Sequence, residues 1–115
     1  MRIDHVQVAA PPGCEAEARA FYGGVLGLRE LEKPEALQAR GGVWFEHLHV
    51  GVEEDFRPAR KAHPAFVVTD LALLAARLEA GKYRVAEDGL LDGRRRVFAD
   101  DPFGNRIELI EDAPV

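Results

Sequence analysis

Short apolar runs recur along the chain, and Gly, Pro and charged residues separate them. Runs of four to eight residues that are rich in Val, Ile or Leu and alternate with polar positions are typical of β-strands. The pattern predicts strands at residues 3–9, 28–31, 43–52, 65–68, 83–86, 95–99 and 106–110. Strands are therefore expected to dominate the fold.

Two segments have helical patterning instead. Residues 15–22 (EAEARAFY) carry two glutamates in the first turn, which suits the helix dipole, and a Gly-Gly pair follows them. In residues 71–80, four apolar side chains fall at i, i+3, i+4 and i+7, which defines one buried face: Leu71, Leu74, Ala75 and Leu78. Asp70 is the expected N-cap, and Gly81 is expected to end this helix.

The two halves of the chain share this order of elements, namely a strand, a helix and then about three strands. A shift of 58 residues also pairs His5 with His63, Ala18 with Ala76, Arg19 with Arg77 and Gly23 with Gly81. We therefore predict an α+β fold of tandem βαβββ modules within a single domain, residues 1–115. Module one is expected at 1–52, a charged linker at 53–61 and module two at 62–115.

Composition narrows the class of protein. The 115 residues are 47% hydrophobic and 30% charged, which is ordinary for a globular domain. The apolar runs are far shorter than the ~20 residues that span a bilayer, so we expect no membrane segment. A net charge of -5 argues against nucleic acid as a partner. The single cysteine, Cys14, and a start without signal-peptide features predict a cytoplasmic protein.

Four side chains could bind a metal: His5, His49, His63 and Glu108. The shift that pairs His5 with His63 is almost the shift of 59 that pairs His49 with Glu108. Three imidazole nitrogens and one carboxylate oxygen suit a divalent transition metal such as Zn, Ni, Co, Mn or Fe. Each residue could instead be an ordinary polar position on a strand, and His47 competes with His49 for any role.

Three further residues are candidates for contact with substrate. Trp44 and Phe45 occupy adjacent strand positions, so one of them faces the same side as His49. Phe45 has the parity of His47 and His49, so we expect Phe45 and His47 to line the site. Arg96, in the run 94–96, is the candidate for pairing with an anionic substrate group.

Several strings together point to a known family. They are HVQV at the N-terminus, FYGGVLGL after the first helix, His63 at the start of the second half, and DPFGNRIEL at residues 101–109. Over nearly the whole chain, this combination resembles the vicinal oxygen chelate superfamily. That superfamily includes glyoxalase I, the fosfomycin-resistance thiol transferases, extradiol dioxygenases and bleomycin-resistance proteins.

The resemblance implies a fold, ligands and an assembly. It implies paired βαβββ modules that form a curved, cup-like mixed sheet with helices outside. It places metal ligands at His5, His63 and Glu108, and a variable fourth ligand at His49, where glyoxalase I typically has a glutamate. Because of that departure, Glu108 would serve as both ligand and catalytic base. Small members usually form homodimers in which two subunits share each site.

Two functions follow from this resemblance. The first is a metal-dependent small-molecule enzyme of glyoxalase-like type, a lyase, isomerase or thiol transferase, in which the metal chelates adjacent substrate oxygens. The alternative is a metal-free protein that sequesters a small molecule or an antibiotic, as bleomycin-resistance proteins do. The acidic net charge would suit a cationic drug, whereas the presence of the His and Glu side chains favours the enzyme.

Overall fold

A computed structural model describes residues 1–112 of the chain. The chain divides into two compact units, of which the first comprises Met1–Ala59 and the second begins at Arg60. This boundary lies within the predicted linker at 53–61. The prediction of one domain, with modules at 1–52 and 62–115, stays a prediction, and each unit is described by itself below.

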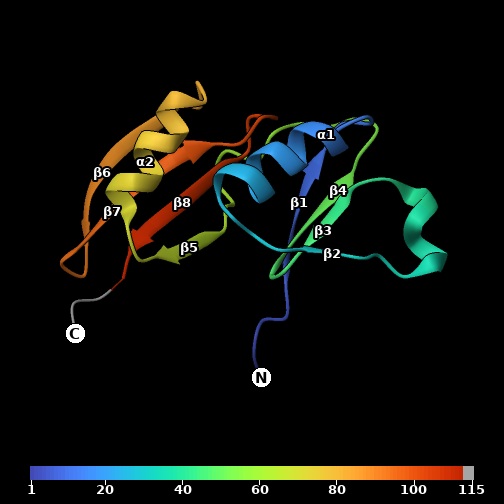
Figure 1. Ribbon diagram of the computed structural model, residues 1–115, viewed down its shortest axis with the longest axis horizontal. Helices are drawn as coiled ribbons and strands as arrows, with labels where there is room; N and C mark the ends of the chain where they lie inside the picture. The colour runs from blue at the N-terminus through green and yellow to red at the C-terminus, as the bar shows by residue number, and fades with distance from the viewer. Residues whose placement is uncertain (113–115) are drawn as a thin grey trace. The chain divides into compact units, whose positions relative to one another are not determined.

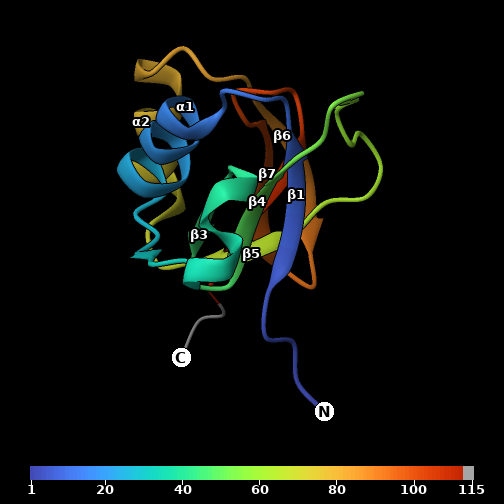
Figure 2. The same cartoon turned by 90° about the vertical axis from the view of Figure 1, so that its right-hand side faces the viewer.

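Unit 1 contains a mixed four-stranded sheet in the order β1-β4-β3-β2 (Figure 1). Its strands are β1 (Val6–Ala10), β2 (Glu30–Leu31), β3 (Val43–Phe45) and β4 (Leu48–Val52). The first and last strands, β1 and β4, run parallel, and the other neighbours run antiparallel. Figure 2 shows β1 and β4 side by side. The sheet is open, with β1 and β2 as its edges.

Helical segments supply the other layer of unit 1. The predicted helix at 15–22 begins as α1 (Glu15–Ala18) and continues as a π-helical segment, Arg19–Val25, in which the Leu26 amide donates to the Phe21 carbonyl at 2.9 Å. The aromatic side chains of this segment pack on the sheet, because Tyr22 lies 6.0 Å from the Phe45 ring and both are fully buried. A 3₁₀ segment, Glu35–Arg40, was not predicted.

Unit 2 repeats the same arrangement. Its strands are β5 (Ala65–Val68), β6 (Val85–Leu91), β7 (Arg94–Asp100) and β8 (Arg106–Glu111), in the order β5-β8-β7-β6. Again the first and last strands are parallel and the rest antiparallel. Helix α2 (Leu71–Ala80) packs on β6, β7 and β8 with the four predicted apolar side chains buried. The Asp70 side chain caps it by accepting from the Leu73 amide at 3.0 Å.

The shared topology confirms the predicted α+β fold of tandem βαβββ modules. Apolar residues of β7 and β8 alternate toward the helix: Val97, Ala99, Ile107 and Leu109 are buried. The residues between them lie on the opposite face of the sheet, which is where the candidate chemistry falls. Among residues 1–112, no helix is long and apolar enough to cross a membrane.

Some predicted boundaries were wrong. The expected strand 43–52 is two strands, because the Glu46-His47 turn between β3 and β4 folds them into a hairpin. His47 has a φ of 71°, in the left-handed region that ends a strand. The first strand starts at Val6 rather than residue 3, and the strand expected at 83–86 extends to Leu91.

The turn that leads into β8 is held by a buried carboxylate. Asp101 is 4% exposed, and its Oδ1 accepts from the amides of Phe103 and Asn105 at 2.9 and 2.8 Å. Its Oδ2 accepts from the Asn105 side-chain amide at 2.9 Å. These contacts of the Asp101 carboxylate fix the turn at residues 101–105 ahead of Glu108.

We predict that Asp101→Ala lowers the free energy of unfolding by about 2–4 kcal/mol, because it removes the carboxylate that accepts three hydrogen bonds within this turn. Urea denaturation followed by circular dichroism measures this. Asp55→Ala is the matched control, since Asp55 is exposed in the segment between the sheets, and it should change the value by less than ~0.5 kcal/mol. Equal stability of the two variants would contradict the assigned role of Asp101.

Candidate metal centre

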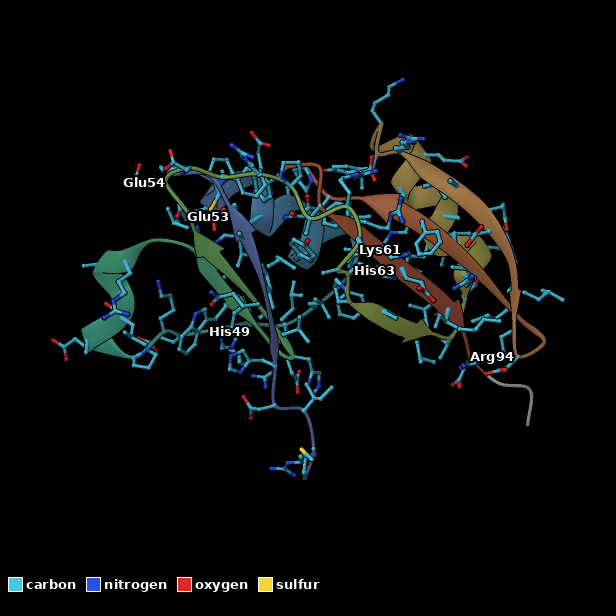
Figure 3. All side chains as sticks on the ribbon, turned by 180° about the vertical axis from the view of Figure 1, so that it is seen from behind. His49, Glu53, Glu54, Lys61, His63 and Arg94 are labelled. Atoms are coloured by element: carbon cyan, nitrogen blue, oxygen red, sulfur yellow. The ribbon has the colours of Figure 1, made fainter. Side chains whose placement is uncertain are left out.

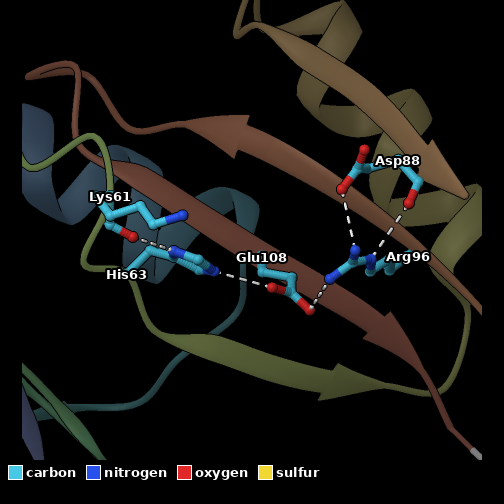
Figure 4. A network of polar contacts seen from close by, with 5 residues as sticks. All are labelled: Lys61, His63, Asp88, Arg96 and Glu108. Carbon is cyan, nitrogen blue, oxygen red and sulfur yellow. Dashed lines mark hydrogen bonds and ion pairs between the residues drawn. The ribbon is translucent and has the colours of Figure 1, made fainter. Parts of the chain in front are cut away.

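In unit 2, strand pairing brings His63 and Glu108 together. The parallel register of β5 and β8 sets Ala65 opposite Glu108, and His63 lies two residues before Ala65. The Glu108 amide donates to the Pro64 carbonyl at 3.0 Å, which extends the ladder toward His63. The His63 Nε2 then lies 2.9 Å from the Glu108 Oε1 (Figure 4). The Glu108 side chain is only 6% exposed and the His63 side chain is 24% exposed, so the pair is part-buried with its carboxylate on the inside.

The other ring nitrogen of His63 fixes the tautomer. Nδ1 lies 2.7 Å from the Lys61 carbonyl oxygen, which can only accept, so Nδ1 carries the proton. In the neutral imidazole, Nε2 then has a lone pair that faces a carboxylate oxygen. Two acceptors at this distance repel each other unless a proton or a cation bridges them. The pair is therefore suited to hold either a proton or a metal ion.

The separation of these two atoms also fits a metal. Neighbouring ligands of an octahedral ion at ~2.1 Å lie roughly 3.0 Å apart, whereas tetrahedral ligands lie roughly 3.4 Å apart. The observed 2.9 Å is compatible with the octahedral value and is equally the ordinary length of a hydrogen bond between the two groups. A histidine that donates its other N–H to a backbone carbonyl is also a common arrangement in metal sites. His63 and Glu108 thus fit a divalent ion as two of its ligands.

Charged and aromatic groups surround Glu108. The Arg96 Nη1 lies 3.5 Å from its Oε2, and the Arg96 Nη2 lies 3.0 Å from Asp88. Phe98 is directly opposite Glu108 across β7 and β8. The guanidinium carbons of Arg96 and Arg106 lie 5.3 and 5.0 Å from the centre of the Phe98 ring.

In unit 1, three rings form a stack. The His49 ring lies between His5, at 3.8 Å between centroids and 14° between planes, and Trp44, at 4.1 Å and 10°. Trp44 is opposite His49 in the β3–β4 register, and His5 lies two residues before Gln7, which is opposite His49 in the β1–β4 register. Figure 3 shows His49 on β4 and His63 ahead of β5, each within its own unit.

Hydrogen bonding and burial differ between the two stacked histidines. The His5 Nδ1 lies 2.8 Å from Asp4 Oδ2, so Nδ1–H donates to a carboxylate and Nε2 is left to act as a ligand. Burial, and to a lesser degree the neighbouring His5, lower the pKa of His49, and Asp4 only partly opposes this. His49 is therefore neutral over a wider pH range than an ordinary histidine, as a metal ligand needs to be.

The stack bears on how many of these histidines can ligate together. Ring lone pairs lie in the ring plane, so two stacked and nearly parallel imidazoles hold them in separate, nearly parallel planes that do not meet at one ion. As arranged, His5 or His49 can bind a given ion, but not both. Use of both would require one ring to leave the stack.

The structure brings the four predicted ligands together in two pairs, His5 with His49 and His63 with Glu108. The pairs belong to different units. In the part of the chain that the structure describes, no group of three or more His, Cys, Asp or Glu side chains is gathered as a metal site. The pairs do occupy equivalent register positions, because each first histidine lies two residues before the residue opposite the second ligand.

Two of the predicted substrate contacts lie elsewhere than expected. The prediction that Phe45 shares the face of His49 is wrong, because Phe45 pairs with Leu48 and is fully buried against the helical layer. A two-residue hairpin reverses strand parity, so Trp44 faces His49 instead. His47 lies in that hairpin turn, exposed, rather than on the strand with His49.

Sequence reasoning also missed partners of the candidate ligands, namely Trp44, Phe98, Asp88 and Asp4. The first two could have been found from the hairpins, since the turns at 46–47 and 101–105 place each aromatic opposite a candidate ligand. Asp88 could not, because a bulge in β6 sets its position.

The comparisons with known proteins agree with this fold. The family model described as the Glyoxalase/Bleomycin resistance protein/Dioxygenase superfamily matches residues 2–109. The chain belongs to this superfamily. None of the curated proteins matches the chain.

Solved structures extend the comparison. A glyoxalase family protein from Bacillus anthracis is 48% identical, with a TM-score of 0.91 over 98% of this chain and 96% of that one. A glyoxalase/dioxygenase from Nostoc punctiforme is 23% identical, with a TM-score of 0.80 over 98% and 92%. A mutant fosfomycin resistance protein from Listeria monocytogenes, complexed with Mn(II) and 1S,2S-dihydroxypropylphosphonic acid, is 14% identical, with a TM-score of 0.78 over 97% and 92%. The last two likenesses show the fold alone.

The ring stack generates a prediction for metal-free protein. Trp44 is the single tryptophan, and a protonated imidazole stacked on an indole quenches its fluorescence. Because the pKa of His49 is lowered, the quenching should develop as the pH falls, with a midpoint below ~6.5. His49→Gln should remove this step, whereas His47→Asn should keep it. A midpoint above 6.5 that survives His49→Gln would contradict the stack.

Proposed function

We propose that this protein is a metal-dependent enzyme of glyoxalase-like type that acts on a small, oxygen-rich molecule by lyase, isomerase or thiol-transfer chemistry. The observation that carries the proposal is the His63–Glu108 pair. Its two acceptor atoms are 2.9 Å apart in a part-buried position, and the Lys61 carbonyl turns the lone pair of His63 toward the carboxylate. Membership of the superfamily supports the same class of chemistry.

The proposed ligands are His5, His63 and Glu108. His5 offers its Nε2 because Asp4 holds its Nδ1, and it resembles His63 in this respect. His49 is the fourth predicted ligand; in its present position, between His5 and Trp44, it would instead orient the His5 ring. Two histidines and one carboxylate leave positions of a divalent ion open to substrate oxygens.

A bound dication would polarise two adjacent substrate oxygens and stabilise the negative charge that develops on them. Glu108 would act as general base as well as ligand, and would accept the substrate proton on a carboxylate lone pair that the metal does not occupy. The low exposure of Glu108 keeps water away from this carboxylate. Arg96 stays a proposed substrate contact, because a guanidinium can pair with an anionic substrate group.

The assembly and location are also proposals. We propose a homodimer in which the two ligand pairs supply shared sites, and a cytoplasmic location, which the single cysteine supports. Analytical ultracentrifugation tests the first of these. A monomer at micromolar concentration would contradict the shared-site dimer.

The metal proposal predicts about one divalent transition metal per chain when untagged protein is purified without chelator and analysed by elemental mass spectrometry. His63→Ala should lower the bound metal at least tenfold with little change in thermal unfolding, because His63 is a partly exposed residue ahead of β5. His47→Asn is the matched control, since asparagine tolerates the left-handed turn and His47 lies outside both ligand pairs.

Full metal content in His63→Ala would overturn the ligand assignment. Absence of metal from the natural protein, even after titration with Ni, Co, Mn, Fe and Zn, would favour the metal-free binding protein. Given bound metal, methylglyoxal–thiol adducts, fosfomycin with thiols, and catechols are the substrates to assay. Loss of turnover in Glu108→Gln that still binds its full complement of metal would then support the catalytic role of Glu108.

A further inference from the structure

We infer that Arg96, anchored by Asp88, is a positioning residue that holds the second oxygen of Glu108, so that only Oε1 is offered to the metal. This inference rests on the proposed function, because it concerns how the proposed carboxylate ligand is presented. It assigns a role to the interaction between β6, β7 and β8 on the face of the sheet opposite α2.

The two oxygens of Glu108 have different partners. Oε1 faces the His63 Nε2 at 2.9 Å, and Oε2 faces the Arg96 Nη1 at 3.5 Å (Figure 4). A carboxylate with both oxygens free can bind a metal through either oxygen or through both. With Oε2 next to a guanidinium, the carboxylate is expected to bind through one oxygen in a defined orientation.

Arg96 is itself held at two points by one residue. Its Nη2 donates to the Asp88 carboxylate at 3.0 Å, and its Nε donates to the Asp88 carbonyl at 3.3 Å. Three of its nitrogens are thus engaged, and its side chain is 22% exposed. A guanidinium constrained in this way can orient a neighbour, whereas a freely rotating side chain cannot.

The backbone of β6 makes this anchor possible. The β6–β7 register shifts between Glu87 and Leu90, so that two residues, Asp88 and Gly89, oppose Arg96. Gly89 has a φ of 64°, which a glycine adopts without strain. Such a bulge redirects the side chain and carbonyl of its residues. Here both groups of Asp88 meet the same guanidinium.

The aromatic neighbour restricts Arg96 further. Its guanidinium carbon lies 5.3 Å from the centre of the Phe98 ring, which is two residues along β7 and opposite Glu108. The His63 ring meets the same Phe98 edge-on at 5.3 Å between centroids. Arg96 and His63, the two partners of Glu108, therefore pack on one side chain, which links their positions.

The adjacent residues provide a matched control. Arg95 pairs with Glu87 through its Nε at 3.2 Å, and a second contact joins its Nη2 to the same carboxylate. These residues precede Arg96 and Asp88 by one position each, so strand alternation places them on the other face. The same strands thus carry two Arg–carboxylate pairs, of which one contacts Glu108.

The experiment compares Arg96→Lys with Arg95→Lys. Lysine keeps the positive charge of residue 96, so the electrostatic repulsion between this residue and the bound cation is unchanged. A change in Co²⁺ affinity therefore cannot come from removal of that charge. Lysine lacks the planar fork that contacts Asp88 and Glu108 together. The measurements are the Co²⁺ dissociation constant, by competition with a chromophoric chelator, and the visible absorption of the Co²⁺-loaded protein.

We expect Arg96→Lys to weaken Co²⁺ binding about tenfold and to change the Co²⁺ spectrum, because the carboxylate orientation is no longer fixed. Arg95→Lys should stay within about twofold and keep the spectrum. Thermal unfolding of the metal-free variants checks that both are folded. Asp88→Asn should weaken Co²⁺ binding, as Arg96→Lys does. Glu87→Gln makes the same change of charge and should leave Co²⁺ binding unchanged.

The possible outcomes separate the two claims. If the natural protein binds Co²⁺ and the Arg96 and Arg95 variants match it in affinity and spectrum, the positioning role is overturned while the proposed function stands. If Asp88→Asn and Glu87→Gln weaken binding equally, the effect of Asp88 is general electrostatics and the anchor is overturned. If the natural protein binds no Co²⁺, the proposed function fails and this inference fails with it.

Discussion

Hydrogen bonding between the first and last strands of each unit is the constraint on which the candidate site depends. In a parallel pair the register decides which side chains become neighbours, because a shift of one residue moves every side chain to the opposite face. The pairings Gln7 with His49 and Ala65 with Glu108 are equivalent in the two units. Each brings the histidine two residues upstream beside the ligand on the last strand.

Burial of Glu108 then determines its surroundings. A carboxylate that is 6% exposed needs charge and hydrogen-bond partners, since an unpaired buried charge is strongly destabilising. The structure supplies a histidine at one oxygen and an arginine at the other. The bulge in β6 places Asp88 where its carboxylate and carbonyl hold that arginine near Glu108. The candidate ligand and its supports thus form one network.

Local patterns in the sequence predicted most of the strands and helices, but they did not predict correctly which aromatic side chain faces His49. The strand at 65–68 and the helix at 71–80, with its cap at Asp70, match the structure because strand periodicity, helix periodicity and capping agree there. The strand at 43–52 was wrong because no Gly or Pro marks its turn, and a left-handed His47 makes it. Because this hairpin was not predicted, Phe45 was assigned to the face of His49, whereas the β3–β4 register places Trp44 there.

Other features could not be obtained from the sequence. The shift that pairs His49 with Glu108 indicated that the two residues occupy equivalent positions. Only the strand register shows that His5 lies beside His49 and His63 beside Glu108. The anchor at Asp88 depends on a bulge, and bulges follow from pairing along a whole strand rather than from a local motif. The stacking of Trp44 on His49 likewise could be predicted only if the position of the β3–β4 hairpin were known.

Comparison of the two units shows why one scaffold can hold two kinds of ligand. In both, the last strand carries the candidate ligand and the third strand carries an aromatic directly opposite it, Trp44 facing His49 and Phe98 facing Glu108. A neutral imidazole carries no net charge, so His49 stacks between His5 and Trp44 without requiring a countercharge. A carboxylate does require one, and in unit 2 the aromatic packs against the guanidinium groups of Arg96 and Arg106. The chemistry of the ligand therefore dictates what its neighbours on the same face must be.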